Sequence, residues 1–334
     1  MHTCLQLIIL QTLFVRSTQA TCPFPSSKDD ICTSIKEFLN SLISLKAAIL
    51  ENFGIIEKTK DQSSIKIQQG FGYKAKKYCS DIINELKQLY NLSSSNFYEE
   101  TSLAMEFSHM AALGFEVGDK IVWGCGGSLI SDKFVLTAAH CIVDKNLGQV
   151  NYVRLGVNRK IEDVENFQVV NVYAHPDYRP PLRYNDIALI ELHDSVLSST
   201  YPNVACLNID RNVNGYDKFN VTGWGLLQNF GESADQVQKV EVDLVSWMEC
   251  KQHYPADGEL KSGIVDDLQI CIDTCQGDSG EPLQKRILFN PLPRLNTIFG
   301  VSSFGKGCGL SSSPGVYTRV SNYIDWIESI VWPN

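Results

Sequence analysis

Apolar residues recur at helical spacing in the first part of the chain, before about residue 95. Between Ser27, which can cap a helix, and Gly54, which can end one, the apolar positions are Ile31, Ile35, Phe38, Leu42, Leu45 and Ile49. A second amphipathic stretch begins at Ser80, with Ile82, Ile83, Leu86, Leu89 and Tyr90 on one side. We therefore expect residues 21–95 to form a small helical region that packs on the rest of the protein and ends in a polar linker.

From about residue 118 the pattern changes to short β-rich runs separated by turn residues. The runs include Lys120–Trp123, Phe134–Leu136, Val169–Tyr173, Ile187–Ile190, Phe219–Thr222 and Ile298–Val301. Many short strands at even spacing predict an all-β sandwich or barrel. A last helix is expected at residues 321–332, capped by Ser321, because the apolar residues from Tyr323 to Ile330 share one face.

The first 20 residues and the cysteines predict a secreted protein. Residues 4–15 form an apolar run too short to span a bilayer, and small residues at Thr18 and Ala20 follow it, as in a signal peptide of residues 1–20. Of the 11 cysteines, only Cys4 would be removed with it. The remaining even number fits five disulfides in an oxidising compartment, and a sequon at Asn91 marks a glycosylation site.

Composition narrows the possible partners. The chain carries 29 Lys and Arg against 38 Asp and Glu, for a formal net charge of −9, and it has no basic run. These properties argue against nucleic acid or a membrane surface as a partner. A hydrophobic content of 44% is ample for a packed core.

Three short segments carry the residue types that nucleophilic acyl transfer requires. His140 ends an apolar strand, Asp186 precedes a buried strand, and Ser279 lies in the glycine-rich run Gly-Asp-Ser-Gly. The reaction needs a hydroxyl nucleophile, an imidazole to accept its proton and a carboxylate to orient that imidazole. Each segment alone is modest support, whereas the three together in this order are strongly specific.

With these motifs in place, residues 106–334 resemble the trypsin/chymotrypsin-like serine proteases. Further matching segments are Glu106-Phe-Ser-His-Met-Ala, Cys125-Gly-Gly-Ser-Leu-Ile, Val221-Thr-Gly-Trp-Gly225 and Pro314-Gly-Val-Tyr-Thr-Arg-Val320. Gly305-Lys-Gly-Cys-Gly309 and Lys77-Tyr-Cys79-Ser are most similar to insect secreted proteases of the clip-domain kind. The resemblance implies two six-stranded antiparallel β-barrels with a C-terminal helix in residues 96–334, preceded by residues 21–95 as a pro-region.

The resemblance also implies a role for each site residue. Ser279 would be the nucleophile, His140 the general base and acid, and Asp186 the group that orients the imidazole. The backbone N–H groups of Gly277 and Ser279 would form the oxyanion hole, worth about 3 kcal/mol per donor. No metal or cofactor is implied, and no pair of the other histidines has the spacing of metal ligands.

Substrate preference would follow from the pocket beside Ser279. Asp273 stands six residues before Ser279, where trypsin-like members place the carboxylate that pairs with a substrate Arg or Lys. Gly305 and Gly315 match the small wall positions of the pocket, and Ser303 is assigned to substrate binding. The expected reaction is therefore hydrolysis of peptide bonds after Arg or Lys.

The cysteine pairing is implied by the same family. The expected disulfides are Cys125–Cys141, Cys250–Cys271, Cys275–Cys308 and Cys79–Cys206, the last tethering the pro-region. Cys22 and Cys32 would form the fifth pair. A clip domain would need six cysteines in the pro-region, which contains three, so a true clip domain is not expected.

The chain departs from the family at three places. Where relatives have a new N-terminus of Ile-Val-Gly-Gly after a basic residue, the aligned residues are Asn96-Phe-Tyr-Glu99 after Ser95. The loop between Cys271 and Cys275 is short, and Glu281 stands where a glycine is usual. The last change introduces a charged side chain where backbone normally packs closely.

These features leave three hypotheses. The first is a secreted serine endopeptidase in an extracellular proteolytic cascade, with an upstream activating protease and a serpin-type inhibitor as partners besides its protein substrates. The second is a non-catalytic homologue that acts as a binding or decoy module, which the altered activation site favours. The third is a competent enzyme that needs no conventional activation cut.

Overall fold

The computed structural model describes residues 70–92, 106–144, 146–156, 166–196, 204–213, 218–224, 237–273, 279–287, 295–306 and 313–333. The chain divides into two compact units, residues 1–70 and 71–334. The expected signal peptide and the helix expected between Ser27 and Gly54 lie outside the described residues. All the described residues except Gly70 belong to the second unit.

Six antiparallel strands close into the first barrel, in the order β1-β2-β3-β8-β7-β6. The strands are β1 Met110–Val117, β2 Lys120–Leu129, β3 Phe134–Thr137, β6 Tyr152–Leu155, β7 Asn166–Ala174 and β8 Ala188–Leu192. β1 and β2 form a hairpin whose turn uses Gly118 at a φ of 61°, a conformation that favours glycine. A separate two-stranded sheet pairs β4 Val143–Asp144 with β5 Gly148–Gln149.

The second sheet runs in the order β11-β10-β14-β15-β16-β13-β12, with β9 pairing in parallel with β15. Its strands are β9 Cys206–Leu207, β10 Phe219–Gly223, β11 Gln238–Val242, β12 Leu244–Val245, β13 Gln269–Ile272, β14 Pro282–Ile287, β15 Leu295–Phe304 and β16 Gly315–Arg319. The two edge strands, β11 and β12, are separated in sequence by Asp243 alone, so this residue joins the two edges of the sheet. The predicted fold of two barrel-like sheets with a C-terminal helix is confirmed. The first sheet is the expected closed six-stranded barrel, whereas among the described residues the second is an eight-stranded half-barrel.

Apolar clusters fill each barrel and join the two. The first contains the inward residues of β1, β3 and β8, and the second those of β10, β13 and β15. A further cluster, which includes Met110 of β1 and the fully buried Trp224 after β10, connects the barrels. The short helix α5, Trp247–His253, is capped by Ser246, whose hydroxyl accepts a hydrogen bond from the Glu249 amide.

The C-terminal helix is present, although it begins later than the sequence predicts. Residues Val320–Asn322 form a 3₁₀ turn, η3, and helix α6 spans Ile324–Val331. The expected cap at Ser321 is wrong, because this side chain is fully buried within η3 and makes no capping hydrogen bond. α6 buries Ile324 and Ile327 in the core of the first barrel, although it follows the second barrel in sequence.

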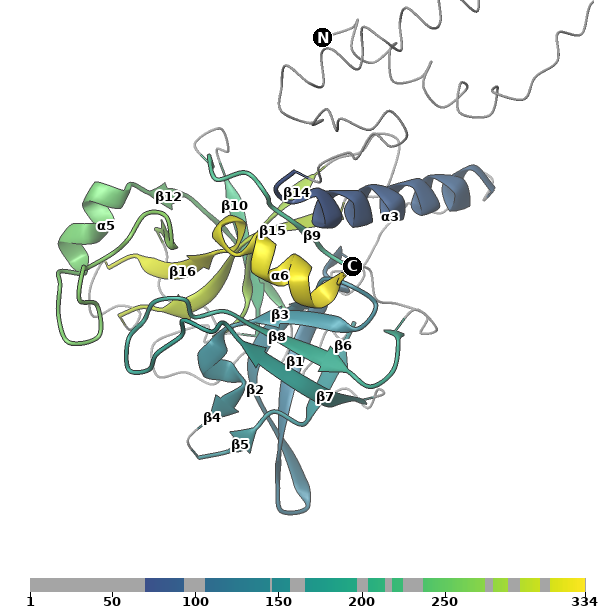
Figure 1. Cartoon of the computed structure of the whole chain (residues 1–334), viewed down its shortest axis with the longest axis horizontal. Coiled ribbons are helices and arrows are strands. Elements are labelled where there is room, and N and C mark those ends of the chain that lie inside the picture. Colours follow the sequence, from purple (N-terminus) through teal and green to yellow (C-terminus); the bar gives the residue numbers. More distant parts are fainter. Residues whose placement is uncertain are drawn as a thin grey trace, which may run out of the picture. The chain divides into compact units, whose positions relative to one another are not determined.

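Helix α3, Tyr73–Leu92, lies against β9 and α6 (Figure 1). It begins seven residues before the predicted stretch at Ser80, directly after a turn in which Gly72 has a φ of 68°. The disulfide Cys79–Cys206 links α3 to β9. Among the described residues, no helix is long and apolar enough to cross a membrane.

The start of α3 is held by the C-terminal helix. A carboxylate oxygen of Glu328 in α6 accepts a hydrogen bond of 2.7 Å from the buried amide of Ala75. Lys74 Nζ donates to the carbonyl of Trp332 at 2.6 Å, and the ring of Tyr78 lies 5.1 Å from that of Trp332. A carboxylate at the first turn of a helix also interacts favourably with the helix dipole.

Replacing Glu328 by Ala should loosen α3 while the barrels stay folded. The variant loses a buried hydrogen bond to a charged acceptor, which is worth about 2 kcal/mol. We expect faster amide hydrogen exchange along α3 and unchanged exchange in β1–β8. Glu241→Ala, at an exposed position of β11, is the matched control, and equal exchange of α3 in both variants would contradict this role of Glu328.

Candidate active site

The pairing of β3 with β8 brings His140 close to Asp186. These strands run antiparallel, and Thr137 at the end of β3 lies opposite Ala188 at the start of β8. Residues just after β3 therefore adjoin residues just before β8. His140 lies in the 3₁₀ turn η1, Ala139–Cys141, and Asp186 is two residues before β8.

Both carboxylate oxygens of Asp186 contact His140. Oδ2 lies 2.8 Å from the imidazole Nδ1, and Oδ1 accepts the backbone amide of His140 at 2.9 Å. The hydroxyl of Ser303 in β15 donates to Oδ2 at 2.6 Å, and that of Thr318 in β16 donates to the Asp186 carbonyl at 2.8 Å. The carboxylate, on a residue only 4% exposed, is thus held by groups from both barrels.

The surroundings of Asp186 favour its ionised form. Burial raises the pKa of this carboxyl group, but the hydrogen bonds and charge of His140 and the Ser303 hydroxyl outweigh burial, so its pKa lies below the ordinary value. An ionised carboxylate can only accept hydrogen bonds, so Nδ1 of His140 carries a proton. In the neutral imidazole, Nε2 then has a free lone pair and can act as a base.

Ser279 lies on a turn that is fixed to β2 and β15. Its carbonyl accepts the amide of Gly126 at 2.8 Å, and the amide of Gly280 donates to Ser302 at 2.9 Å. Gly280 has a φ of 82°, and a Cβ there would lie 2.4 Å from the carbonyl oxygen of Gly126. This position therefore requires glycine. Ser279 itself is half-buried.

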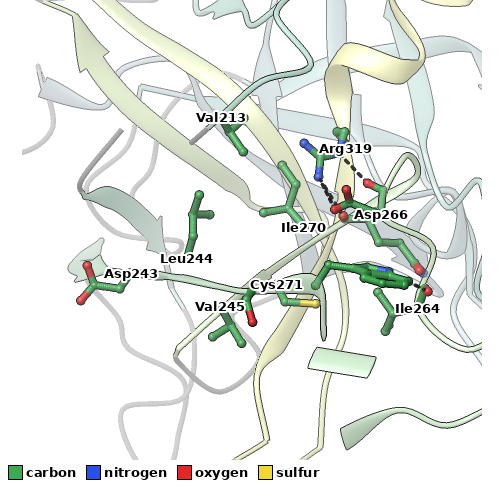
Figure 2. A pocket seen from close by; sticks show the side chains of 12 residues that line it. Val213, Asp243, Leu244, Val245, Ile264, Asp266, Ile270, Cys271 and Arg319 are labelled. Atoms are coloured by element: carbon green, nitrogen blue, oxygen red, sulfur yellow. Dashed lines mark hydrogen bonds and ion pairs between the residues drawn. The ribbon is translucent and has the colours of Figure 1, made fainter. Parts of the chain in front are cut away.

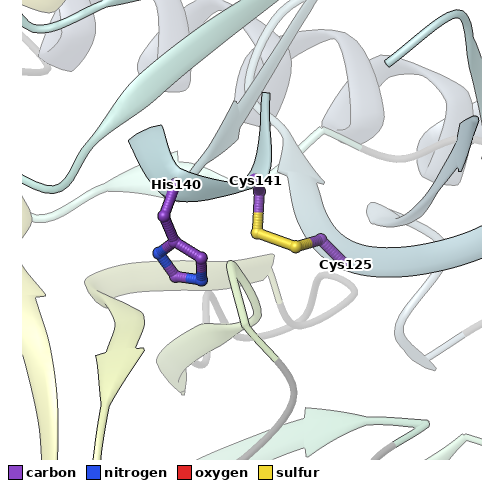
Figure 3. A group of neighbouring side chains, drawn as sticks. All are labelled: Cys125, His140 and Cys141. Atoms are coloured by element: carbon purple, nitrogen blue, oxygen red, sulfur yellow. A yellow bond between two sulfur atoms is a disulfide. The ribbon is translucent and has the colours of Figure 1, made fainter. Parts of the chain in front are cut away.

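The disulfide Cys125–Cys141 fastens the turn of His140 to β2 (Figure 3). Cys125 precedes Gly126, which binds the Ser279 carbonyl, so both turns are attached to neighbouring residues of β2. Cys125, His140 and Cys141 present their side-chain N and S atoms within 4.8 Å of one another, a spacing that a metal site could have. Because both sulfurs are bonded in the disulfide, neither is a thiolate ligand.

Of the residues expected to bind substrate, Gly305 and Gly315 come together at adjoining ends of β15 and β16, where Phe304 lies opposite Val316. Ser303, 6% exposed, directs its hydroxyl to Asp186. Asp273 follows β13, whose last residue, Ile272, lies opposite Gly315. Its exposed side chain accepts the amide of Asp243 at 2.8 Å, through Oδ1.

A cavity of about 340 Å³ lies beside β12, β13 and α5 (Figure 2). Arg319 borders it and donates from Nη2 to Oδ1 of Asp266 at 3.2 Å, while Trp247 donates from its indole to the carbonyl of Ile264. The cavity shares no lining residue with the His140–Asp186 pair or with the residues expected to bind substrate. We therefore do not assign it to catalysis.

Three of the expected site residues lie outside the described residues, namely Gly277, Cys275 and Cys308. The expected disulfide Cys250–Cys271 is present in the structure.

Two residues that position Asp186 were not predicted from the sequence. Thr318 donates a hydrogen bond to the Asp186 carbonyl. Asn185 precedes Asp186 with a φ of 55°, and its side chain accepts the Tyr323 hydroxyl at 2.9 Å. An asparagine before the aspartate was the one available signal for this turn.

Comparison with known proteins agrees with this geometry. The sequence model of the family described as Trypsin matches residues 100–327. Serine protease snk of Drosophila melanogaster is 37% identical over 250 residues, covering 68% of this chain and 54% of that protein. Serine protease Hayan of the same species is 36% identical, covering 68% and 38%.

The extent of the match differs between relatives. Venom protease of Bombus pensylvanicus is 36% identical over 236 residues, covering 65% of this chain and 90% of that protein. The chain spans about half the length of serine protease snk and less of Hayan. The matched region contains His140, Asp186 and Ser279. The chain belongs to the trypsin family of serine proteases.

Proposed function

We propose that this protein is a secreted serine endopeptidase in which Ser279, His140 and Asp186 form the catalytic triad. The observation that carries the proposal is the 2.8 Å contact between Nδ1 of His140 and a buried carboxylate. That contact leaves Nε2 available as a base, as the Ser-His-Asp mechanism requires. The three disulfides among the described residues are typical of an oxidising, extracellular environment and support secretion.

In this mechanism the Ser279 hydroxyl attacks the carbonyl carbon of the substrate while His140 Nε2 accepts its proton. The C–N bond then breaks, and the same proton passes to the leaving amine, which gives an acyl-enzyme that water hydrolyses. The amides of Gly277 and Ser279 would stabilise the oxyanion. Asp186 keeps the proton on Nδ1 throughout.

We further propose that the enzyme cleaves after Arg or Lys and acts within an extracellular proteolytic cascade. The preference is based on Asp273, Gly305 and Gly315, which match the family's pocket positions. The cascade is supported by relatives such as the protein named phenoloxidase-activating enzyme 1 of Spodoptera litura, 32% identical over 251 residues. An upstream protease would activate it, and a serpin-type protein would inhibit it.

Labelling with a fluorophosphonate probe, before and after limited proteolysis, tests the catalytic proposal. We expect wild type to be labelled and Ser279→Ala to remain unlabelled, because only an activated serine displaces fluoride from the probe. Labelling only after proteolysis would identify a zymogen, and N-terminal sequencing would locate the cut. A folded protein that is never labelled but still binds a basic-residue inhibitor would instead be the non-catalytic homologue.

Peptide substrates that differ only at the cleaved position test the preference. Wild type should cleave after Arg and Lys in preference to Leu. Asp273→Asn should reduce kcat/KM for Arg and Lys peptides selectively, because it removes the charge that would pair with them. Equal loss on all peptides would contradict a role of Asp273 in selection.

A further inference from the structure

Glu281 is a buried carboxylate two residues after Ser279. The residue is 1% exposed, and its Oε1 accepts the backbone amide of Trp224 at 2.9 Å. Its carbonyl accepts the amide of Ser302 at 2.8 Å. The sequence alone suggested a charged side chain where backbone packs closely, whereas the structure gives this charge a specific hydrogen-bond donor.

The space for this side chain comes from two glycines on neighbouring strands. A Cβ on Gly126 of β2 would lie 2.5 Å from Cγ of Glu281, and a Cβ on Gly223 of β10 would lie 1.5 Å from Oε2. Neither glycine has a positive φ, so the backbone itself would accept alanine. At Gly126 the one atom closer than 3.4 Å to such a Cβ is Cγ of Glu281. Alanine is therefore excluded at this position by the glutamate side chain and not by the backbone.

The same residues hold Ser279. The amide of Gly126 donates to the Ser279 carbonyl at 2.8 Å, and the amide of Gly280 donates to Ser302 at 2.9 Å. The Glu281 side chain therefore packs against the residue of β2 that binds the serine turn, and its carboxylate ends on Trp224. Trp224 is fully buried in the cluster that joins the two barrels.

We propose that Glu281 is a positioning residue for Ser279: its carboxylate binds the Trp224 amide while its Cγ packs against Gly126, so that the side chain holds the serine turn between the two barrels. This inference rests on the proposed function, since a nucleophile must exist for its position to matter. Glu281 is not expected to touch substrate. Its loss should therefore lower kcat and the labelling rate while leaving KM nearly unchanged.

The conservative variant separates position from charge. Glutamine has the shape of glutamate, and its Oε1 can still accept the Trp224 amide, so Glu281→Gln should label within about threefold of wild type. Glu281→Ala leaves that amide without its acceptor and lets the turn shift. A displacement of about 1 Å at a reacting group costs on the order of 100-fold in rate. We expect a loss between about 10-fold and 100-fold.

A double-mutant cycle tests the contact with β2. Gly126→Ala should slow labelling in the wild-type background, because its Cβ would meet Cγ of Glu281. In the Glu281→Ala background the same substitution should cost much less, since the shortest contact is gone. Gly258→Ala, at a position with no atom within 4 Å of an added Cβ, is the control and should leave labelling unchanged in both backgrounds.

The experiment measures labelling rates, kcat and KM on the full chain at a temperature where circular dichroism shows every variant folded. Wild-type labelling with an unchanged rate in Glu281→Ala would overturn the positioning role and leave the proposed function standing. A wild type that is never labelled would overturn both. If Glu281→Ala does not fold, Glu281→Asp replaces it: a slower Asp variant beside a normal Gln variant supports the inference, and equal rates contradict it.

Discussion

Asp186→Asn is expected to lower the rate of acylation at Ser279 on the order of 10⁴-fold, the size typical of this substitution in Ser-His-Asp triads. The Asp186 Oδ1 position accepts the His140 amide, so the oxygen of an asparagine would remain there. Its NH₂ group would then face Nδ1 of His140. A donor at this place forces Nδ1 to accept and moves the imidazole proton to Nε2, the atom that must take the proton of Ser279.

The rate of fluorophosphonate labelling is measured for wild type and for Asp186→Asn, both before or both after limited proteolysis, according to which form of wild type is labelled. An unfolding curve is recorded for each protein. We expect little change in stability compared with the change in rate. Asp194→Asn is the matched control, because the Asp194 side chain is 79% exposed beside His193. A loss of less than tenfold in Asp186→Asn would contradict the assignment of Asp186 as the orienting carboxylate.

Acid is expected to destabilise the protein through His109, the residue immediately before β1. His109 is 2% exposed, and burial lowers its pKa to about 4, with the amide of Gln284 offsetting only part of this effect. In the unfolded chain the same imidazole titrates near 6.5. Between these values the unfolded state binds the extra proton, so the free energy of unfolding falls as pH decreases from about 6.5 to 4, and the contribution lost is about 3 kcal/mol.

Urea unfolding at several pH values between 7 and 4.5 measures this effect. His109→Gln should be less stable than wild type at pH 7 but should lose less stability on acidification, because it cannot take up that proton. His193→Gln is the control, because the His193 side chain is 63% exposed. Its free energy of unfolding should have the same pH dependence as that of wild type. Identical slopes for wild type and His109→Gln would show that His109 does not control acid stability.

Local pattern was sufficient to predict several strands of the two barrel-like sheets. β2, β3, β7, β10 and β15 each contain the β-rich run predicted for them, and β8 begins one residue after the start of its predicted run. These runs are recognisable because alternation and branched residues express which face of a strand is buried. The ends of helices were less predictable. α3 starts early because a distant residue, Glu328, binds the amide of Ala75, and α6 starts late because a 3₁₀ turn precedes it.

The accommodation of Glu281 shows why an unusual residue could not be judged from its own motif. Its carboxylate is satisfied by Trp224, 57 residues away, and its volume is provided by Gly126 and Gly223. A motif of six residues contains none of these partners. Whether a buried charge disrupts a site depends on donors and space supplied by other strands.

The family and the candidate triad residues His140, Asp186 and Ser279 could be identified without a fold, because each of the three lies in a short segment whose residue types and order are recognisable. The groups that hold Asp186 became apparent only from the three-dimensional structure. Ser303, 117 residues away, and Thr318, 132 residues away, reach it from β15 and β16. A hydrogen bond requires a donor–acceptor distance that is correct to within a few tenths of an ångström. Strand pairing sets such distances, and a pattern of residue types does not contain them.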